Sequence, residues 1–408
     1  MQSEPNNQRP RLLMVATVPV TLRGFLLPFA RHFRARGWRV DGMAAGVSSN
    51  RDCVENFDRV WDVEWSRNPL HPRNLFGVPP IIREIVRRED YDLVHVHTPV
   101  AAFVTRWALR RMRRNGRPQV IHTYHGFIFY KGGPAVPNLL FRTLEKAAGR
   151  WADDLVVINR EDEAAALEYR LIPPDRLTYM PGIGVDTDRL TPETVSQEQI
   201  AAARRSIGLS PTDSLFLMVA EFNPGKRHKE AVTAFARLGD GPHHLAFAGV
   251  GRMEPEIRAL VAEKGLATRV HFLGFRDDIP ALMRASVATL LPSEREGLPR
   301  SVMESLCLEV PVIGSDIRGI RDLLQEGGGR MTPVGDVAAL TDAMGWILHH
   351  PEEAAASARR GRQWMTRFDL RRVVAMHEEL YDRALARLPE RLVERGTALN
   401  EVTTDGNT

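Results

Sequence analysis

Cysteine is almost absent from this sequence. Its 408 residues contain only Cys53 and Cys307, which lie far apart and form no CxxC-type pair. The sequence therefore argues against a disulfide framework and against a cysteine metal site, since both need several cysteines at suitable spacing. Such scarcity is typical of a chain that works in the reducing cytoplasm.

Long hydrophobic runs are also missing. No apolar stretch approaches the ~20 residues that a membrane-spanning helix needs. The first eleven residues, MQSEPNNQRPR, are polar and lack the apolar segment of a signal peptide. We therefore expect a cytoplasmic chain that is soluble or, at most, peripherally bound to the inner face of the cell membrane.

The excess of one charge is small. The formal net charge is only +4, although the sequence pI is about 9.2 and arginine supplies most of the positive charge. Such an excess suits anionic small molecules or an acidic membrane surface. It is too mild to predict a nucleic-acid partner.

What the chain does contain is an alternation of short apolar runs with amphipathic stretches. RLLMVATVPV, YDLVHVHTP and RPQVIHTYHG precede a segment rich in Pro, Gly and Asp at 177–193, after which SLFLMVAEF, ASVATLLPS and VPVIGSD follow. Strands that alternate with helices indicate parallel sheets, and the length exceeds what one core normally supports. The sequence therefore predicts an α/β protein with two doubly wound, Rossmann-like domains that face each other across a cleft. The predicted parts are a disordered N-terminus (1–10), an N-terminal domain (11–188), a C-terminal domain (189–365), a helix that crosses back to the N-terminal domain (366–390) and a disordered tail (391–408).

Two carboxylates stand eight residues apart in SEREGLPRSVMESLCLEVP, Glu296 before a Gly-Leu-Pro break and Glu304 after it. An acid/base pair, a metal site and two contacts with one extended ligand all fit this spacing. Gly297 permits a tight turn, and Pro299 is expected at the first position of a helix. The free N–H groups from Leu298 onward then point out of the helix start, where a diphosphate binds well.

The same stretch resembles the signature of the retaining GT-B glycosyltransferases of family 4. The resemblance lies in the E-x7-E pair, the EG-x-P turn, the helix with the second Glu and the PVI that follows, with Glu309 where a Gly is usual. It implies the GT-B fold. It also implies that Glu296 contacts a donor sugar, that Glu304 holds a ribose, and that the Gly-Leu-Pro turn lies against the donor.

A second resemblance extends over about residues 11–385. The runs HVHTPVAAFVTRWALRR, HGF-x-FYKG and V-INRED are similar to the members of that family that build capsular and exopolysaccharide repeat units on lipid carriers. This similarity implies that His125, at the end of a strand in TYHGF, faces the donor sugar. It also implies a polyprenyl-diphosphate-linked saccharide as the acceptor.

A leaving diphosphate needs positive charge as the glycosidic bond breaks, and the loop NPGKRHKEA supplies it. Lys226 matches the diphosphate Lys of the family. Glu221 occupies the position where many relatives carry an Arg, so Arg227 is the candidate for a second cation.

Two further segments complete the predicted site. The backbone near Phe275 is expected to meet the base, for which uridine is the commonest choice in the family and guanosine the alternative. Arg23 and Gly24, in TLRGF, take the place of the family's Gly-rich loop, which approaches the phosphates and the acceptor.

Two patterns imitate metal sites. His95 and His97 alternate on one strand, but no third ligand follows at metal-like spacing. The run Asp186-Thr187-Asp188 mimics the metal-binding DxD of another glycosyltransferase fold, yet it lies in GVDTDRL, which looks like the family's linker. We therefore expect no metal and no cofactor apart from the nucleotide-sugar substrate.

Two helical stretches combine arginines with apolar residues. Basic amphipathic helices beside an acceptor cleft fit docking on an anionic membrane. A stripe that faces the core, with solvated arginines, fits the same pattern. The first stretch contains Phe25, Leu26, Phe29 and Phe33 with Arg23, Arg31, Arg34 and Arg36, and the second contains Arg106, Arg110, Arg111, Arg113 and Arg114.

The sequence thus predicts a retaining, metal-independent glycosyltransferase. It would move a sugar from a nucleotide-diphosphate donor to a lipid-linked saccharide in exopolysaccharide or capsule biosynthesis. Two other functions are compatible with the same residues. One is transfer to a soluble acceptor, as in a sucrose- or trehalose-type synthase, and the other is a catalytically silent subunit that binds a nucleotide sugar.

Overall fold

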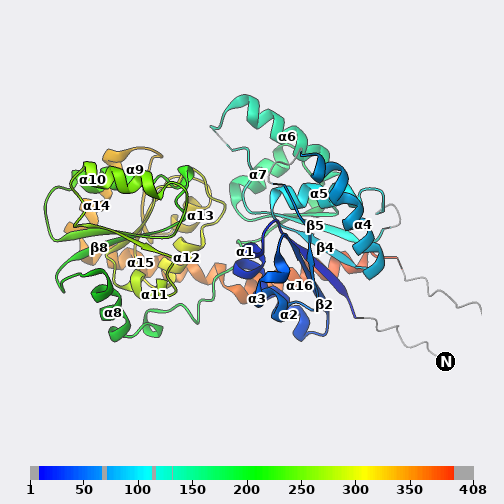
Figure 1. Ribbon diagram of the computed structural model, residues 1–408, viewed down its shortest axis with the longest axis horizontal. Helices are drawn as coiled ribbons and strands as arrows, with labels where there is room; N and C mark the ends of the chain where they lie inside the picture. The colour runs from blue at the N-terminus through cyan, green and yellow to red at the C-terminus, as the bar shows by residue number, and fades with distance from the viewer. Residues whose placement is uncertain (1–8, 67–70, 113–115, 131, 390–408) are drawn as a thin grey trace, which may run out of the picture.

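The computed structural model describes residues 9–66, 71–112, 116–130 and 132–389. The two predicted disordered ends, 1–10 and 391–408, lie outside these ranges except for Arg9 and Pro10. Arg113 and Arg114 of the second basic stretch also lie outside them. The described chain forms two α/β halves that lie side by side (Figure 1).

Each half is built on one parallel sheet. The strand order is β3-β2-β1-β4-β5-β6-β7 in the first and β10-β9-β8-β11-β12-β13 in the second, and all neighbouring strands pair in parallel. The order reverses between β1 and β4 and between β8 and β11, and ligands of doubly wound sheets bind at such reversals. The predicted doubly wound α/β fold is therefore confirmed. The strands are β1 (Arg11–Val15), β2 (Arg39–Ala44), β3 (Val60–Asp62), β4 (Leu93–Val96), β5 (Gln119–Tyr124), β6 (Asp154–Val157), β7 (Leu177–Tyr179), β8 (Ser214–Val219), β9 (His243–Ala248), β10 (Val270–Gly274), β11 (Ala288–Leu291), β12 (Val312–Ser315) and β13 (Gly329–Thr332).

Helices cover both faces of the sheets, because alternate strand residues point to opposite faces. Leu12 and Phe33 belong to the core on one face of the first sheet, whereas Leu13 and Ile82 belong to the core on the other. No helix in the described ranges is both long and apolar enough to cross a bilayer. The α-helices are α1 (Pro19–Thr21), α2 (Leu27–Ala35), α3 (Arg51–Asn56), α4 (Val78–Glu89), α5 (Pro99–Leu109), α6 (Ala135–Gly149), α7 (Arg160–Glu168), α8 (Gln197–Ile207), α9 (His228–Arg237), α10 (Glu254–Glu263), α11 (Ile279–Arg284), α12 (Arg300–Cys307), α13 (Ile320–Leu324), α14 (Val337–His349), α15 (Pro351–Met365) and α16 (Leu370–Ala386).

The chain passes between the halves twice, and the two passages are paired. Val185 donates its N–H to Phe368 O at 2.9 Å and accepts from Leu370 N at 2.9 Å. Beyond this pair, α16 packs under the first sheet, where Tyr381 joins its core (Figure 1). Two hydrogen-bonded segments of the chain, and not a single linker, pass between the halves near residue 188. The domain boundary at that residue stays a prediction.

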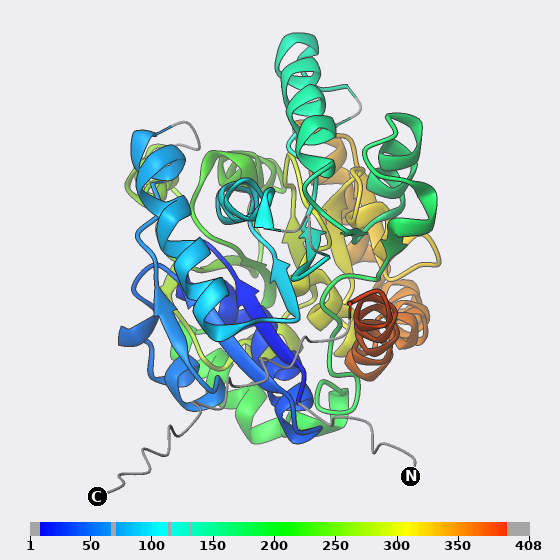
Figure 2. The same ribbon diagram turned by 90° about the vertical axis from the view of Figure 1, so that its right-hand side faces the viewer.

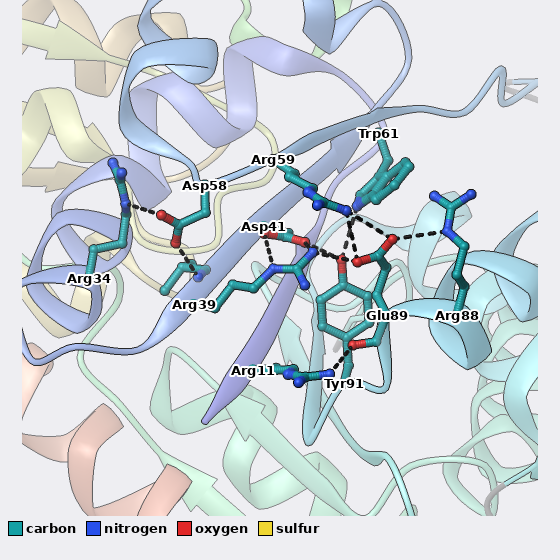
Figure 3. Close-up of polar contacts among 11 residues, drawn as sticks. Arg11, Arg34, Arg39, Asp41, Asp58, Arg59, Trp61, Arg88, Glu89 and Tyr91 are labelled. Atoms are coloured by element: carbon teal, nitrogen blue, oxygen red, sulfur yellow. Dashed lines mark hydrogen bonds and ion pairs between the residues drawn. The ribbon is translucent and has the colours of Figure 1, made fainter. Parts of the chain in front are cut away.

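A charged network ties the amino ends of the first sheet together (Figure 3). Arg39 donates to Asp41 at 2.6 Å and to Glu89 at 2.7 Å, and Glu89 also accepts from Arg59 at 3.0 Å. Burial alone would raise the pKa of Glu89, but the hydrogen bonds from Arg39 and Arg88 lower it overall. Since ligands bind at the carboxyl ends of such strands, we assign this network to stability.

The first basic stretch differs from its prediction in two ways. Residues 21–25, predicted as a loop, lie within a continuous helical segment that includes a π-helical turn, η1 (Leu22–Leu26). Leu26, Phe29 and Phe33 are all buried in the core against the sheet and α16. The core-facing interpretation is therefore right for these three residues, and membrane docking through them is wrong, whereas Phe25 of the same stretch is 36% exposed.

Candidate functional site

The two halves meet at a backbone contact between the ends of β5 and β11. His125 and Gly126 follow β5, and Gly297 lies in the loop after β11. A Cβ atom on Gly297 would lie 1.9 Å from His125 O, and one on Gly126 would lie 3.1 Å from Gly297 Cα. Because no side chain fits at Gly297, this glycine serves the contact between the halves as well as the predicted turn.

Lys226 and Glu296 are 70 positions apart in the sequence and form an ion pair. The Lys226 Nζ lies 2.6 Å from Glu296 Oε1, and the Glu296 side chain is only 10% exposed. Lys226 ends the 3₁₀ turn η7 (Pro224–Lys226) after β8, whereas Glu296 follows β11, the neighbour of β8 in the sheet. The topological reversal of the second sheet thus brings together the two residues predicted to contact the diphosphate and the sugar.

Arg227 and Phe275 have different surroundings from this pair. The Arg227 backbone is left-handed, with φ of 58°, and its guanidinium bonds to Glu230. Arg227 Nε also lies 3.9 Å from a Glu294 carboxylate oxygen. Phe275 follows β10 and is 70% exposed. The second-cation role of Arg227 and the base contact at Phe275 both stay predictions.

The helix α12 starts one residue later than predicted. Pro299 is extended, with φ of −71° and ψ of 122°, and precedes the first helical residue, Arg300. Pro299 is therefore an N-cap and not the first helical residue. Leu298 is buried, and its side chain packs against Gly182, where a Cβ atom would lie 2.7 Å from Leu298 Cδ2. Apolar packing of Leu298 against Gly182 thus holds in place the Gly-Leu-Pro turn, which the sequence analysis assigned to the donor.

Arg300 connects Glu304 with the other half of the molecule. Its Nε donates to Glu304 Oε1 at 2.7 Å, and its NH1 donates to the carbonyl oxygen of Gly24 at 2.7 Å. Arg23, beside Gly24, is exposed and lies 3.9 Å from Asp52. The predicted ribose carboxylate and the predicted acceptor segment therefore lie within reach of one guanidinium.

His125 is paired with a second histidine. Its Nε2 lies 3.3 Å from Nδ1 of His97, which follows β4, and the two rings stack with centroids 5.5 Å apart. Burial, together with the nearby His377, lowers the pKa of His125 to about 4. The imidazole is therefore neutral near pH 7 and can exchange hydrogen bonds with a ligand without carrying charge.

His95 is held in the core behind this pair. Its Nδ1 lies 2.6 Å from the hydroxyl of Tyr381 on α16, and its Nε2 lies 2.7 Å from the hydroxyl of Thr123. Burial also lowers the pKa of His95 and of His97 well below the ordinary value. The alternating histidines thus form a neutral support under His125, which agrees with their interpretation as packed strand-end residues.

Arg318 was not singled out by the sequence, yet it links the two halves behind the site. It is 4% exposed and pairs with Asp162 at 2.6 Å. Its guanidinium also donates to the carbonyl oxygens of Phe127 and Phe129 and, at 3.3 Å, to that of Glu296. Arg318 therefore fixes the loop that carries His125 relative to the backbone of Glu296. A lone Arg in a loop has no spacing that marks its partner, so only the INRED run that contains Asp162 gave a signal.

The Asp186-Thr187-Asp188 run lies beside the paired passages. Asp186 accepts from the N–H groups of Asp188 and Arg189, and the Asp188 carboxylate lies 2.8 Å from Arg371. Among the described residues, no group of three His, Cys, Asp or Glu side chains could hold a metal ion. Metal independence stays a prediction.

A cavity of about 790 Å³ lies between the halves on the side of α6 and α7. Both halves line it, through Tyr130 and Tyr169 on one side and Arg318 and Arg321 on the other. Arg318 thus belongs both to this cavity and to the loop of His125.

Two family models match most of the chain. The model described as Glycosyltransferase Family 4 matches residues 25–189, and the model described as Glycosyl transferases group 1 matches residues 199–364. One similar protein is EpsD of Bacillus subtilis (strain 168), assigned as a glycosyltransferase. It is 32% identical over 374 residues, which are 91% of this chain and 96% of the relative.

Two further similar proteins carry more specific names. A UDP-Gal:alpha-D-GlcNAc-diphosphoundecaprenol alpha-1,3-galactosyltransferase of Escherichia coli is 26% identical over 267 residues, 64% of this chain and 67% of the relative. The crystal structure of HepE from Anabaena in complex with UDP has a TM-score of 0.75 at 18% identity, and the match covers 92% of this chain and all of that chain. The structural likeness extends over both halves.

Proposed function

The chain belongs to glycosyltransferase family 4, with the GT-B fold, and we propose that it moves a sugar from a UDP-sugar to a lipid-linked saccharide acceptor. The transfer retains the anomeric configuration and needs no metal. The glycosyltransferase activity follows from the family. The donor, the acceptor, the stereochemistry and the metal independence are the proposal.

The observation that supports the proposal best is the ion pair of Lys226 with Glu296 next to the neutral His125. A diphosphate that departs from a sugar gains negative charge, and a preorganised cation stabilises it. The 2.6 Å distance between Lys226 and Glu296 supports a position of Lys226 beside a group that Glu296 holds. The Glu296 carboxylate is an acceptor for the hydroxyls of the donor sugar.

In the proposed reaction the bond between C1 of the sugar and the diphosphate oxygen breaks, and a bond from C1 to the acceptor oxygen forms on the same face. The acceptor proton passes to the departing diphosphate. Lys226 and the free N–H groups at the start of α12 hold the diphosphate. His125 contributes hydrogen bonds to the sugar. It does so without carrying charge, because its pKa is lowered.

The choice of donor and acceptor draws on similar proteins. The E. coli relative is named for a UDP-Gal donor and a diphosphoundecaprenol-linked acceptor. The structures of the Anabaena protein contain UDP, UDP with glucose, and UDP-glucose. We propose the same classes of donor and acceptor for this chain, with the reaction on the inner face of the cell membrane.

The test is a transfer assay with a panel of nucleotide sugars, after thermal-shift measurements have selected the best binder. Synthetic polyprenyl-diphosphate saccharides are compared with free sugars as acceptors. Reactions run with and without EDTA, and NMR of the product gives the anomeric configuration. We expect a UDP-sugar, a lipid-linked product, a retained configuration and full activity in EDTA.

Other outcomes identify the alternatives. Transfer to free sugars but not to lipid-linked ones would show a soluble acceptor. Nucleotide-sugar binding without transfer or donor hydrolysis would show a catalytically silent subunit. Activity abolished by EDTA and restored by a divalent cation would contradict the proposed metal independence.

A further inference from the structure

The helix α6 exposes apolar side chains to solvent. Val136 is 78% exposed, Leu139 and Leu140 are each 55% exposed, and Leu144 is 40% exposed. Single exposed apolar residues are common, whereas a group of large ones on one short helix marks an interaction surface.

These side chains lie on one face of the helix. Val136, Leu140 and Leu144 follow at intervals of four residues, which places them one above the other, and Leu139 lies beside them. Ala147 continues the face and is exposed as well. We call these five residues the α6 apolar face. The 15 residues of α6 make a helix about 22 Å long.

The charges that flank this face are all positive. Lys146, in the last turn, and Arg150, just after the helix, are both exposed. The one acidic residue of α6, Glu145, points away, because its side chain is 14% exposed and pairs with the buried Arg106 at 3.2 Å. An apolar face with a cationic border is complementary to an anionic lipid leaflet.

The position of α6 leaves this face accessible. In both overall views α6 projects beyond the rest of the first half (Figures 1 and 2). Asn138 and Arg142 of α6 line the cavity that Arg318 also lines, and Arg318 donates to the carbonyl oxygen of Phe127 in the loop of His125. Arg106 belongs to the second predicted docking stretch, but it is buried with Glu145 and cannot contact a surface.

We propose that the α6 apolar face docks on the anionic leaflet of a membrane and so brings the site to a lipid-linked acceptor. The lipid-linked acceptor in this inference rests on the proposed function. The exposure and the charges of α6 do not depend on it. The proposed membrane contact is therefore α6, a helix that the sequence analysis did not single out, and not the two arginine-rich stretches. The leucines enter the interface, and Lys146 and Arg150 remain at the headgroups.

The experiment is vesicle flotation of the full chain. Vesicles of phosphatidylcholine that contain anionic phosphatidylglycerol are compared with vesicles of pure phosphatidylcholine. We expect co-flotation with the anionic vesicles, at least tenfold weaker binding of Leu140→Glu/Leu144→Glu, and a smaller loss for Lys146→Glu/Arg150→Glu. High salt should weaken the binding, because the charged part is screened.

A matched control is Val54→Glu on α3. Val54 is 48% exposed, so the substitution adds a charge at similar exposure outside α6. It should bind vesicles like the unmodified chain. Thermal unfolding of every variant checks that folding is unchanged, which is expected because the substituted side chains are exposed.

Two outcomes would overturn docking through α6. One is an unmodified chain that does not float with anionic vesicles. The other is a Leu140→Glu/Leu144→Glu variant that floats as well as the unmodified chain. If sedimentation instead shows self-association that this variant abolishes, the face is an interface between copies, and the proposal is also wrong.

The failure of the proposed function would look different. Leu140→Glu/Leu144→Glu should keep full transfer to a short-chain, water-soluble diphosphate saccharide while it loses transfer to acceptor embedded in vesicles. An unmodified chain that floats but transfers to neither acceptor would contradict the proposed function and leave the docking intact.

Discussion

The two sheets offer different chemistry at the edges where they meet. The first sheet ends in histidines, and burial lowers the pKa of both His97 and His125, so this edge is neutral near pH 7. The second sheet ends in charges, with Lys226 and Glu296 in an ion pair and Glu304 on the following helix. The two sheets share one strand order apart from the additional β7 of the first, so the difference lies in the residues that follow the strands.

This difference assigns a task to each edge. Charged groups suit the diphosphate and the polyhydroxylated donor, which the second half is proposed to hold. Neutral imidazoles suit the hydroxyls of the donor sugar, which His125 is proposed to contact, because they exchange hydrogen bonds without carrying charge. The contact of Gly297 with His125 O joins the two edges. Arg318 stabilises that contact by donating a hydrogen bond to the carbonyl oxygen of Glu296.

The largest effect is expected from removing the Arg318 guanidinium, which connects the two edges. Arg318→Met leaves Asp162 buried without its ionic partner, which costs about 3–5 kcal/mol. We expect a loss of unfolding free energy of that size in denaturant titration. In protein that is still folded, we expect a fall in kcat of about 100-fold or more, with little change in donor KM.

Arg318→Lys separates positioning from stability. Lysine keeps the charge but cannot donate to several acceptors at once. It should restore most of the stability and little of kcat. If Arg318→Lys restored kcat fully, or if Arg318→Met left both quantities unchanged, the two edges would not depend on this guanidinium.

The next largest effect concerns the charged edge. Lys226→Met should lower kcat about 100- to 1,000-fold, the range that follows removal of one donor to a developing anion. Lys229→Met is the matched control, since Lys229 pairs with Glu256 on α10 and not with Glu296. Steady-state kinetics of both variants checks this, and equal kinetics would contradict the role of Lys226.

The neutral edge should make the fold sensitive to acid. The buried histidines of the first half have lowered pKa values, which are about 4 for His125 and His377. An unfolded chain binds these protons near pH 6.5, so the stability is complete above that pH and is lost as the pH falls toward 4. Each proton contributes about 1.4 kcal/mol per pH unit.

Denaturant unfolding at several pH values measures this slope. His377→Phe should reduce it by about one proton, because it removes one buried imidazole and keeps an aromatic ring beside Phe29. A flat stability profile between pH 6.5 and 4.5 would contradict a neutral histidine core.

The smallest effect is expected within the histidine pair. His97→Phe removes the partner of His125 Nε2 and should lower kcat about tenfold without a change in donor KM. His97→Asn keeps a polar partner and should recover most of the rate. A shift in the pH profile of kcat with His97→Phe distinguishes a positioning role from simple packing.

The sequence predicted the fold, and the loops that it singled out after β8 and β11 lie together in the structure, while the roles of their residues stay predictions. Buried strands read as apolar runs, and the loops at their carboxyl ends had to meet, which placed Lys226, Glu296 and His125 near one another. Glu309, the departure from the family pattern, is explained by the structure. It adopts a left-handed conformation with φ of 55° after α12, where glycine is favoured, and its carboxylate lies 3.1 Å from Arg362.

The sequence could not predict which apolar helix faces are covered or which residues pair across the two halves, and the reasons are physical. Phe29 and Leu140 both lie on amphipathic helices, and composition does not tell which apolar face finds a partner. α2 packs under the sheet, whereas α6 remains uncovered. Arg318 depends on a contact across 156 residues with Asp162, which no local spacing encodes. Pairings between the halves therefore had to come from the structure.

The measurement that tests the account most directly compares Glu296→Gln with Glu304→Ala, each for transfer rate and for donor affinity. Glu296→Gln should cut transfer far more than it weakens donor binding, since it removes the carboxylate that is predicted to contact the sugar. Glu304→Ala should weaken nucleotide binding, because it removes the group predicted to hold the ribose. Near-normal transfer and affinity in both variants would contradict the assignment of this site.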